Sequence, residues 1–420
     1  MLSLSKMRVL SFLFYSRVII KDIKGHVKMK IGLFTDTYYP QVNGVATSVQ
    51  ILKKNLEILG HEVYLFTTTD PKSVKEEAHV YRVASIPFVS SRRVGMFYHL
   101  GLAKFIRELG LDLIHTHTEF SLGIFGRTMA KELNIPLLHT YHTIYEQYTH
   151  YIINMSVLES IAKSTARKIS AHFCNSVDRV VVPTDKVKDL LVSYGVNKDI
   201  SIIPTGIEFN KFSKHNYNSD TILKLRSDLG IGANDKVILY IGRISEEKSI
   251  DEILIAMKSF FKGRPDAKFL LVGDGPSKDN LEDMAKKLGI YGQTIFAGEK
   301  SFNEIDQYYQ LGDVFVSASQ SETQGITYIE AVASGIPVVA KTDRCLDGVI
   351  QNGINGYTYQ SMAEFSSYLD SILNDNQEKS RWSIEGIKSI ERFTATNFAA
   401  TILAEYKNMI TNQKDYENVS

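Results

Sequence analysis

Two glutamates eight positions apart, Glu322 and Glu330, are candidate ligand contacts, and one loop glutamate with one solvated helix glutamate is the alternative, because this spacing occurs on many helices. They follow an apolar run, residues 314–319, which the pattern predicts to be a buried strand. Gly325 begins a predicted short helix that ends at Gly335. We therefore expect Glu322 in the loop at the carboxyl end of the strand and Glu330 about two turns into the helix. Such loops bind ligands, and the N–H groups of a helix N-terminus suit a phosphate.

Alternating strands and helices surround this stretch. The first set begins with a predicted strand at residues 30–36, a helix at 45–59 and a strand at 61–69, which together form a βαβ unit. A second set starts with a strand at 236–243, after an irregular segment at 207–218 that we interpret as a hinge. Two such sets predict an α/β fold of two doubly wound, Rossmann-like domains that face a cleft.

The expected domain limits follow from these elements. Residues 29–206 form an N-terminal domain, residues 207–390 a C-terminal domain, and residues 391–420 a last helix that packs back on the N-terminal domain, with a polar tail. Helices are also predicted at 92–109 and 151–175, and helical structure continues from 362 to about 409. We interpret residues 1–28 as an extension or a mispredicted start, with an amphipathic arm that touches a membrane as the alternative.

Length and composition fit a two-domain globular protein. The chain has 420 residues, 44% of them hydrophobic and 23% charged. Cys174 and Cys345 lie far apart, which argues against a disulfide framework and fits a reducing compartment. No Cys and His cluster has zinc spacing, and Asp-x-Asp does not occur, so no metal site is predicted. No apolar run reaches the length of a membrane span.

Charge is divided unevenly along the chain. Residues 1–205 carry 25 Lys and Arg against 17 Asp and Glu, a balance of +8, and residues 206–420 have a balance of −7. A basic first half indicates a face for an anionic partner, although an uneven charge without function is an equal alternative. No nucleic-acid partner is predicted, and the oligomeric state is not predicted.

The two glutamates around a helix start resemble the motif of retaining glycosyltransferases of the GT-B fold, and more narrowly of their fourth family. The resemblance extends from Lys30 to about Ala400. It implies that Glu322 faces the donor sugar and that Glu330 holds the ribose hydroxyls of the nucleotide. It also places Thr323, Gln324 and Gly325 at the donor.

Other motifs match the same family. Arg243 at a strand end and Lys248 downstream resemble the pair that binds the donor diphosphate, and cations suit a leaving group whose negative charge grows. Gly44, in Asn-Gly-Val, corresponds to a turn whose N–H groups reach the diphosphate. Gly273 and Gly275 match a Gly-x-Gly turn near the nucleotide, and a simple tight turn before a helix is the alternative for them.

Several polar residues end strands of the first domain. His142 matches a family histidine that reaches an outer hydroxyl of the donor sugar, whereas His139 is expected inside its strand with a structural role. His115 and His117 end the preceding strand. They either line the acceptor side or are loop histidines whose ring nitrogens are hydrogen-bonded locally. Asp36 ends the first strand and is a candidate acceptor contact.

Within the family, the Ser-Glu-Thr-Gln-Gly segment and residues 34–48 most resemble the bacterial diacylglycerol glucosyltransferases. This resemblance implies UDP-glucose as donor, diacylglycerol as acceptor, and a peripheral protein on the cytoplasmic, inner face of the membrane. No tightly bound cofactor is implied, and Mg²⁺ at the diphosphate stays open. Two basic stretches are expected to dock on anionic lipid; they contain Arg92, Arg93, Lys163, Arg167 and Lys168.

Two other functions stay open. The nearer one is a glycosyltransferase that adds a second hexose to a glycolipid or modifies a soluble acceptor. The other is a sugar-nucleotide epimerase of the same fold, which keeps the nucleotide site but transfers nothing. The identity of the sugar is not predicted, because one substituent separates glucose from galactose or N-acetylglucosamine.

Overall fold

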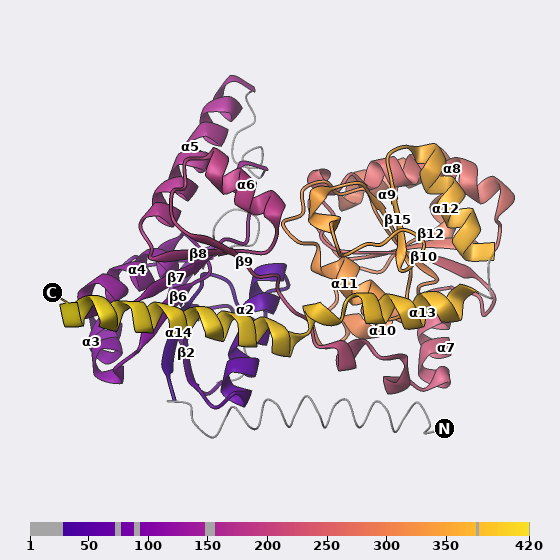
Figure 1. Cartoon of the computed structure of the whole chain (residues 1–420). Helices are drawn as coiled ribbons and strands as arrows, with labels where there is room; N and C mark the ends of the chain where they lie inside the picture. Colours follow the sequence, from indigo (N-terminus) through magenta and orange to yellow (C-terminus); the bar gives the residue numbers. More distant parts are fainter. Residues whose placement is uncertain (1–27, 72–76, 88–92, 148–155, 375–377, 420) are drawn as a thin grey trace, which may run out of the picture.

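Two α/β domains lie side by side in the computed structural model, which describes residues 28–71, 77–87, 93–147, 156–374 and 378–419 (Figure 1). The first contains a seven-stranded parallel sheet with the order β3-β2-β1-β6-β7-β8-β9. Its strands are β1 (Lys30–Phe34), β2 (Glu62–Thr68), β3 (Val80–Val83), β6 (Leu113–Thr116), β7 (Leu137–Thr140), β8 (Arg179–Val182) and β9 (Ile200–Ile202).

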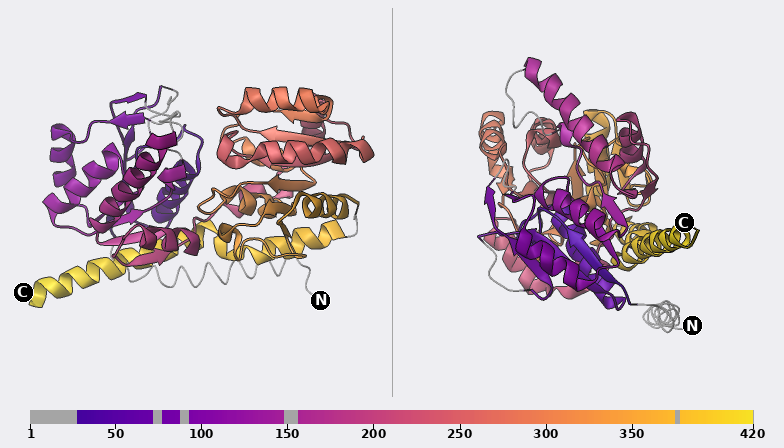
Figure 2. Two further views of the ribbon diagram at one scale, coloured as in Figure 1. Left: turned by 90° about the horizontal axis from the view of Figure 1, so that it is seen from above. Right: turned by 90° about the vertical axis from the view of Figure 1, so that its left-hand side faces the viewer.

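Helices cover both faces of this sheet (Figures 1 and 2). Phe34 packs in the hydrophobic cluster on one face, and its neighbour Leu33 packs in the cluster on the other. Burial on both faces explains why the strands are nearly continuous apolar runs. The helices are α2 (Gly44–Ile58), α3 (Leu100–Leu109), α4 (Ser121–Leu133), α5 (Ser156–Asn175) and α6 (Asp185–Ser193).

The second domain repeats the arrangement with a six-stranded parallel sheet of order β12-β11-β10-β13-β14-β15. Its strands are β10 (Lys236–Ile241), β11 (Ala267–Val272), β12 (Thr294–Phe296), β13 (Val314–Ser317), β14 (Val338–Lys341) and β15 (Gly356–Tyr359). Its helices are α7 (Ser219–Asp228), α8 (Ile250–Gly263), α9 (Lys278–Leu288), α10 (Ile305–Tyr309), α11 (Ile326–Ala333), α12 (Met362–Asn374) and α13 (Glu378–Ser389). The predicted fold of two Rossmann-like domains is confirmed.

The last helix, α14 (Ala395–Val419), leaves the second domain and runs along the first (Figure 1). Phe398, Ile402 and Tyr406 are buried in the same hydrophobic cluster as Leu52 of α2. Burial of such side chains contributes about 1.5–3 kcal/mol each. The helix therefore ties the two domains together through the core of the first.

The predicted helix at residues 92–109 is wrong in its first part. The chain forms strand β5 (Arg93–Gly95), which pairs antiparallel with β4 (Ser85–Pro87), and α3 begins only at Leu100. The reason is tertiary, because the N–H of Gly95 donates to Ser121 Oγ at 2.9 Å and docks the hairpin on α4. No helix among the described residues is both long and apolar enough to span a bilayer.

Candidate active site

The carboxyl ends of β10 and β13 bring two of the predicted residues into contact. The two strands pair in parallel, so the loops that follow them meet at one edge of the sheet. Lys248 lies in a 3-10 turn, η5 (Glu246–Lys248), after β10, and its Nζ donates to Oε1 of Glu322 at 2.7 Å. The two side chains are 11% and 22% exposed, so the pair is largely withdrawn from water.

Electrostatics keep this glutamate charged. Burial raises the pKa of Glu322, but the charge and hydrogen bond of Lys248 and a hydrogen bond from Ser319 outweigh burial, so the pKa lies below its ordinary value of 4.5. Arg243 stands two residues beyond the end of β10 and is half-buried, and its carbonyl oxygen accepts a hydrogen bond of 2.9 Å from Tyr240. This edge of the sheet therefore carries the charges expected at a diphosphate site.

Glycines let the loops after β10 and β11 lie against each other. A Cβ on Gly273, whose φ is +149°, would lie 1.9 Å from the carbonyl oxygen of Gly242. A Cβ on Gly275 would lie 2.2 Å from the carbonyl oxygen of Ile244. Real Cβ atoms do not approach so closely, so packing of the two loops alone requires glycine at both positions. Their contact with a nucleotide stays a prediction.

The N-termini of α2 and α11, one helix from each domain, lie close together. Asn43 caps α2 by accepting from the N–H of Ala46 at 2.9 Å, and Gly44 is the first residue of the helix. A Cβ on Gly44 would lie 3.7 Å from Cδ1 of Ile326, the first residue of α11. Gly325 precedes α11 with a φ of +74°, which favours glycine. Two sets of N–H donors are thus available to an anion between the domains.

Glu330 lies on α11 and is 8% exposed. Tyr309 of α10 donates from its hydroxyl to Glu330 Oε2 at 2.7 Å. Burial raises the pKa of Glu330 to about 7, against the hydrogen bond of Tyr309 and the charge of Lys211, which both lower it. The predicted ribose ligand is therefore a carboxyl group that titrates near neutral pH in the unliganded protein.

Histidines form a connected group at the carboxyl ends of β6 and β7. His117 Nδ1 lies 3.1 Å from His142 Nε2, and His115 lies between Tyr406 of α14 and Thr140, at 2.7 Å from each hydroxyl. His117 Nε2 is buried and has no hydrogen-bond partner among the described residues.

These rings are neutral at physiological pH. Burial, followed by the charge of His139, lowers the pKa of His142 to about 3, and burial also lowers the pKa values of His115 and His117. A neutral imidazole donates through one nitrogen and accepts through the other. His142 is therefore suited to a sugar hydroxyl. His139 lies within β7 and contacts Glu119 at 3.1 Å.

Asp36 serves the fold in a way that was not predicted. Its carboxylate accepts from Thr118 Oγ1 at 2.6 Å, from Ser121 Oγ, and from the N–H of Leu122 at 3.1 Å. The residue is 4% exposed, and its burial, opposed by these hydrogen bonds, raises its pKa. Asp36 thus caps the N-terminus of α4. A contact with the acceptor stays a prediction.

Two of the residues predicted at the donor bind the other domain. The Thr323 carbonyl oxygen accepts from Thr184 Oγ1 at 2.8 Å. The Gln324 side chain accepts from the N–H of Thr205 and donates to its carbonyl oxygen, both at 2.8 Å. The amide of Gln324 is therefore engaged between the domains.

The predicted membrane residues lie on separate elements. Arg92 falls outside the described residues, and Arg93 donates to the carbonyl and hydroxyl oxygens of Ser85 within the β4–β5 hairpin. On α5, Lys163 pairs with Glu159 at 2.7 Å, and Lys168 is exposed.

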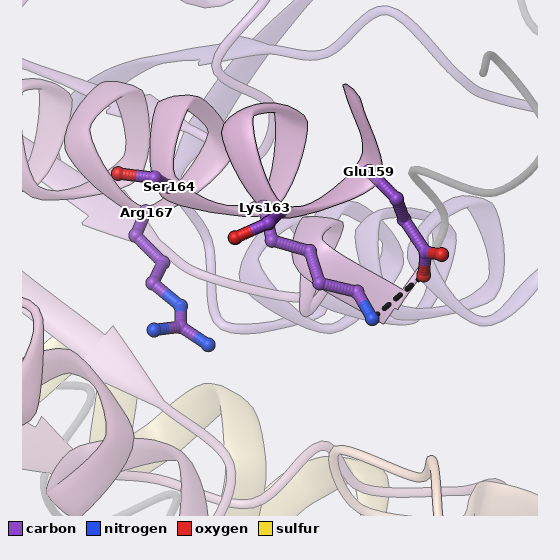
Figure 3. Close-up of a pocket in the computed structure, with 5 residues that line it drawn as sticks. Glu159, Lys163, Ser164 and Arg167 are labelled. Atoms are coloured by element: carbon purple, nitrogen blue, oxygen red, sulfur yellow. Dashed lines mark ion pairs between the residues drawn. The ribbon is translucent and has the colours of Figure 1, made fainter. Parts of the chain in front are cut away.

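One turn further along α5, Arg167 pairs with Glu146. Figure 3 shows Lys163 and Arg167 on one side of α5, where they line an open pocket of about 350 Å³. Across the described part of the chain, no three His, Cys, Asp or Glu side chains are grouped so that they would hold a metal ion.

Comparisons with known proteins agree with this arrangement. A model described as Glycosyltransferase Family 4 matches residues 42–211, and one described as Glycosyl transferases group 1 matches residues 222–389. The alpha-monoglucosyldiacylglycerol synthase of Streptococcus pneumoniae is 39% identical over 398 residues, 92% of this chain and 88% of that protein. The synthase of the same name from Acholeplasma laidlawii is 37% identical over 350 residues, 81% of this chain and 87% of that protein.

Solved structures share the fold. HepE from Anabaena, in complex with UDP and glucose, has a TM-score of 0.73 at 20% identity and covers 90% of this chain and 100% of its own. Sucrose-phosphate synthase from Thermosynechococcus elongatus has a TM-score of 0.73 at 21% identity, with coverage of 92% and 100%. By its family matches and its identity to two relatives along most of its length, the chain belongs to the family 4 glycosyltransferases of the GT-B fold, and the alpha-monoglucosyldiacylglycerol synthases are among its relatives.

Proposed function

We propose that the protein transfers glucose from UDP-glucose to the 3-hydroxyl of 1,2-diacylglycerol, with retention of the anomeric configuration, at the inner surface of the cell membrane. One observation carries the proposal. The chain is 39% identical to an alpha-monoglucosyldiacylglycerol synthase, and its Lys248–Glu322 pair involves the loop that leads into α11, the helix whose first residue lies near Gly44 of α2. In this proposal the second domain binds the nucleotide and the first receives the lipid.

The donor diphosphate would lie between the helix N-termini. Arg243, Lys248 and the N–H groups at Gly44 and Gly325 would stabilise the charge that the diphosphate gains as it leaves. The ribose hydroxyls would donate to Glu330, and Gly273 and Gly275 would keep the second domain's loops close to the nucleotide. Mg²⁺ at the diphosphate is compatible with this arrangement, which itself supplies the positive charge.

Glu322 would orient the sugar by accepting hydrogen bonds from its hydroxyls, and the neutral imidazole of His142 would contact an outer hydroxyl. The bond from the anomeric carbon to the diphosphate breaks as the bond from that carbon to the acceptor oxygen forms on the same face. The acceptor proton passes to a diphosphate oxygen. This route gives retention without a protein nucleophile.

Exposed apolar and basic side chains of the first domain support docking on a membrane. Ile86, Met96, Phe97 and Leu100 around the β4–β5 hairpin are 56–80% exposed. On α5, which projects from the body of the domain (Figure 1), Ile161 and Ile169 are 60% and 57% exposed and stand among the basic residues named above. Apolar insertion next to positive charge favours anionic lipid.

The test is transfer of labelled glucose from UDP-glucose to vesicles of diacylglycerol, with and without phosphatidylglycerol. We expect label in an α-glucosyl lipid and a higher rate with the anionic lipid. Label only when glucosyldiacylglycerol is supplied would replace the proposal with addition of a second sugar. A changed sugar nucleotide after incubation with donor alone would indicate an epimerase.

A matched pair of variants isolates the membrane step. Ile161→Asp on α5 should reduce binding to anionic vesicles, whereas Ile255→Asp on α8 should not, because α8 belongs to the second domain. The two variants are matched, since the exposure of Ile255 is 54%, similar to that of Ile161. Equal loss in both variants, or equal activity on neutral and anionic vesicles, would contradict docking through the first domain.

A further inference from the structure

The loop that carries Glu322 is held from the other domain. We call residues 320–324 the donor loop. Lys186, the second residue of α6, donates from Nζ to the carbonyl oxygens of Gln320 at 2.9 Å and Glu322 at 3.1 Å. Its third hydrogen bond goes to Oδ2 of Asp343 at 2.6 Å. In Figure 1, α6 lies on the side of the first domain that faces the second.

These contacts use the whole hydrogen-bonding capacity of the ammonium group. A lysine has three donors, and here two of them go to backbone carbonyls on either side of Ser321. The side chains of Lys186 and Asp343 are 19% and 6% exposed. Loss of the ammonium would leave the Asp343 carboxylate, whose other oxygen accepts from the N–H of Cys345, without its counter-ion, and would remove this donor from two carbonyls, which is costly.

Neighbouring contacts continue this arrangement along the loop. The Thr323 carbonyl is bound by Thr184, and the Gln324 amide is bound by the backbone of Thr205, as described above. From its own domain, the loop receives the Lys248 contact to the Glu322 carboxylate. The side chain of Glu322 is therefore held by the second domain, and its backbone by the first.

We propose that Lys186 is a positioning residue for sugar transfer, which holds Glu322 in its reactive place only when the two domains are docked as they are here. The inference rests on the proposed contact of Glu322 with the donor sugar. Displacement of a reacting or orienting group by about 1 Å costs up to about 10²-fold in rate. Because Lys186 contacts neither Glu330 nor the glycine turns, its loss should affect sugar transfer more than nucleotide binding.

The variant to make is Lys186→Met, which keeps the length of the side chain and removes its donors. We expect kcat to fall about tenfold or more, with the Kd for UDP within about twofold of wild type. Hydrogen exchange in a peptide that spans the donor loop should become faster. A kcat within twofold of wild type would overturn the proposal. So would a loss of UDP affinity and thermal stability in parallel with kcat, because that outcome indicates a general structural role.

Two controls are available in the same interface. Asp189→Asn, also on α6, breaks an exposed ion pair between the domains, to Arg344 at 2.7 Å, that does not touch the donor loop. It should leave kcat unchanged. Asp343→Asn keeps the two carbonyl contacts of Lys186 and should lose less activity than Lys186→Met. If Asp343→Asn lost as much kcat as Lys186→Met, the effect would come from the Lys186–Asp343 ion pair, and positioning through the two carbonyls would be overturned.

Failure of the inference can be separated from failure of the proposed function. Glu322→Gln is measured in parallel on the same substrates. An impaired Glu322→Gln beside a normal Lys186→Met would contradict the inference alone. Full activity in Glu322→Gln would contradict the role of Glu322 itself. Hydrogen exchange of the loop does not depend on the acceptor and stays informative if diacylglycerol is not a substrate.

Discussion

Acidification from pH 8 to pH 6 should weaken the binding of UDP-glucose about tenfold, and Glu330 is the expected cause. This side chain is 8% exposed, and burial raises its pKa from the ordinary value of 4.5 to about 7. Ribose hydroxyls donate more strongly to a carboxylate than to a carboxylic acid. The donor should therefore bind the charged form and release a proton when it binds at a pH below 7.

The magnitude follows from the pKa. One unit above about 7, roughly nine-tenths of the Glu330 population is charged, and one unit below, roughly one-tenth is. If only the charged form binds, the affinity at pH 6 is about one-tenth of that at pH 8, since the charged fractions are about 1/11 and 10/11, and this is about 1.4 kcal/mol. His142 and His117 do not titrate between pH 6 and pH 8, because the pKa of His142 is about 3 and that of His117 is also lowered.

The assay is calorimetric titration with UDP-glucose between pH 5.5 and 8.5. UDP itself is unsuitable, since a terminal phosphate titrates near pH 6, whereas the diphosphate diester does not. In Glu330→Gln the affinity should be low and independent of pH. In Tyr309→Phe the midpoint should move to higher pH, because the lost hydrogen bond is one that lowers the pKa of Glu330. A wild-type Kd that is constant from pH 6 to 8 would refute the reasoning.

Three further predictions concern stability. Since the folded-state pKa of Glu330 is raised, the folded protein binds the proton more tightly than the unfolded chain does. Relative to Glu330→Gln, the unliganded wild type should therefore lose about 3 kcal/mol of unfolding free energy as the pH rises from 4.5 through 7. Denaturant titration measures this loss. Gly273→Ala should destabilise by about 3 kcal/mol, because its Cβ would meet a carbonyl oxygen at 1.9 Å. Gly263→Ala at the end of α8, with no atom within 4 Å, should not lower the temperature of thermal unfolding. Asp36→Ala should lower the free energy of unfolding by about 2 kcal/mol, because the α4 cap is lost. An unchanged free energy of unfolding with a raised acceptor KM would instead indicate that Asp36 contacts the acceptor.

Much of the fold follows from local patterns. Buried parallel strands are apolar runs followed by helices, and this alternation predicted the two domains. The family resemblance, and not the local pattern, assigned Glu322 and Lys248 to one donor site. Strand β15 was not predicted, because Gly356–Tyr359 contains no apolar run. The segment is a strand because it pairs with β14. The start of the helix at residues 92–109 was wrong for the same reason, since the β4–β5 pairing outweighs local preference.

Sequence patterns do not reveal the partners of residues that contact backbone groups or distant side chains. Lys186 is one lysine among many, and two of its acceptors are carbonyls more than 130 positions away, which every residue type possesses. Asp36 ends a strand as a ligand-binding residue would, and only the packing of α4 shows what its carboxylate binds. The hydrogen bond from Tyr309 to Glu330 was not predicted, because nothing in the sequence around Tyr309 relates it to Glu330.

The two lysines that contact Glu322 act on different atoms from different domains, and this has a consequence for donor binding. A donor diphosphate bound beside Lys248, as proposed, would compete with the Glu322 carboxylate for the same ammonium, so we expect the ion pair to weaken when the donor enters. The carboxylate then becomes available to sugar hydroxyls. Lys186 contacts the carbonyl of Glu322 and lies in the other domain, so the loop need not move as this exchange occurs. Separation of the domains would release the backbone of the loop, and transfer should therefore require the docked arrangement.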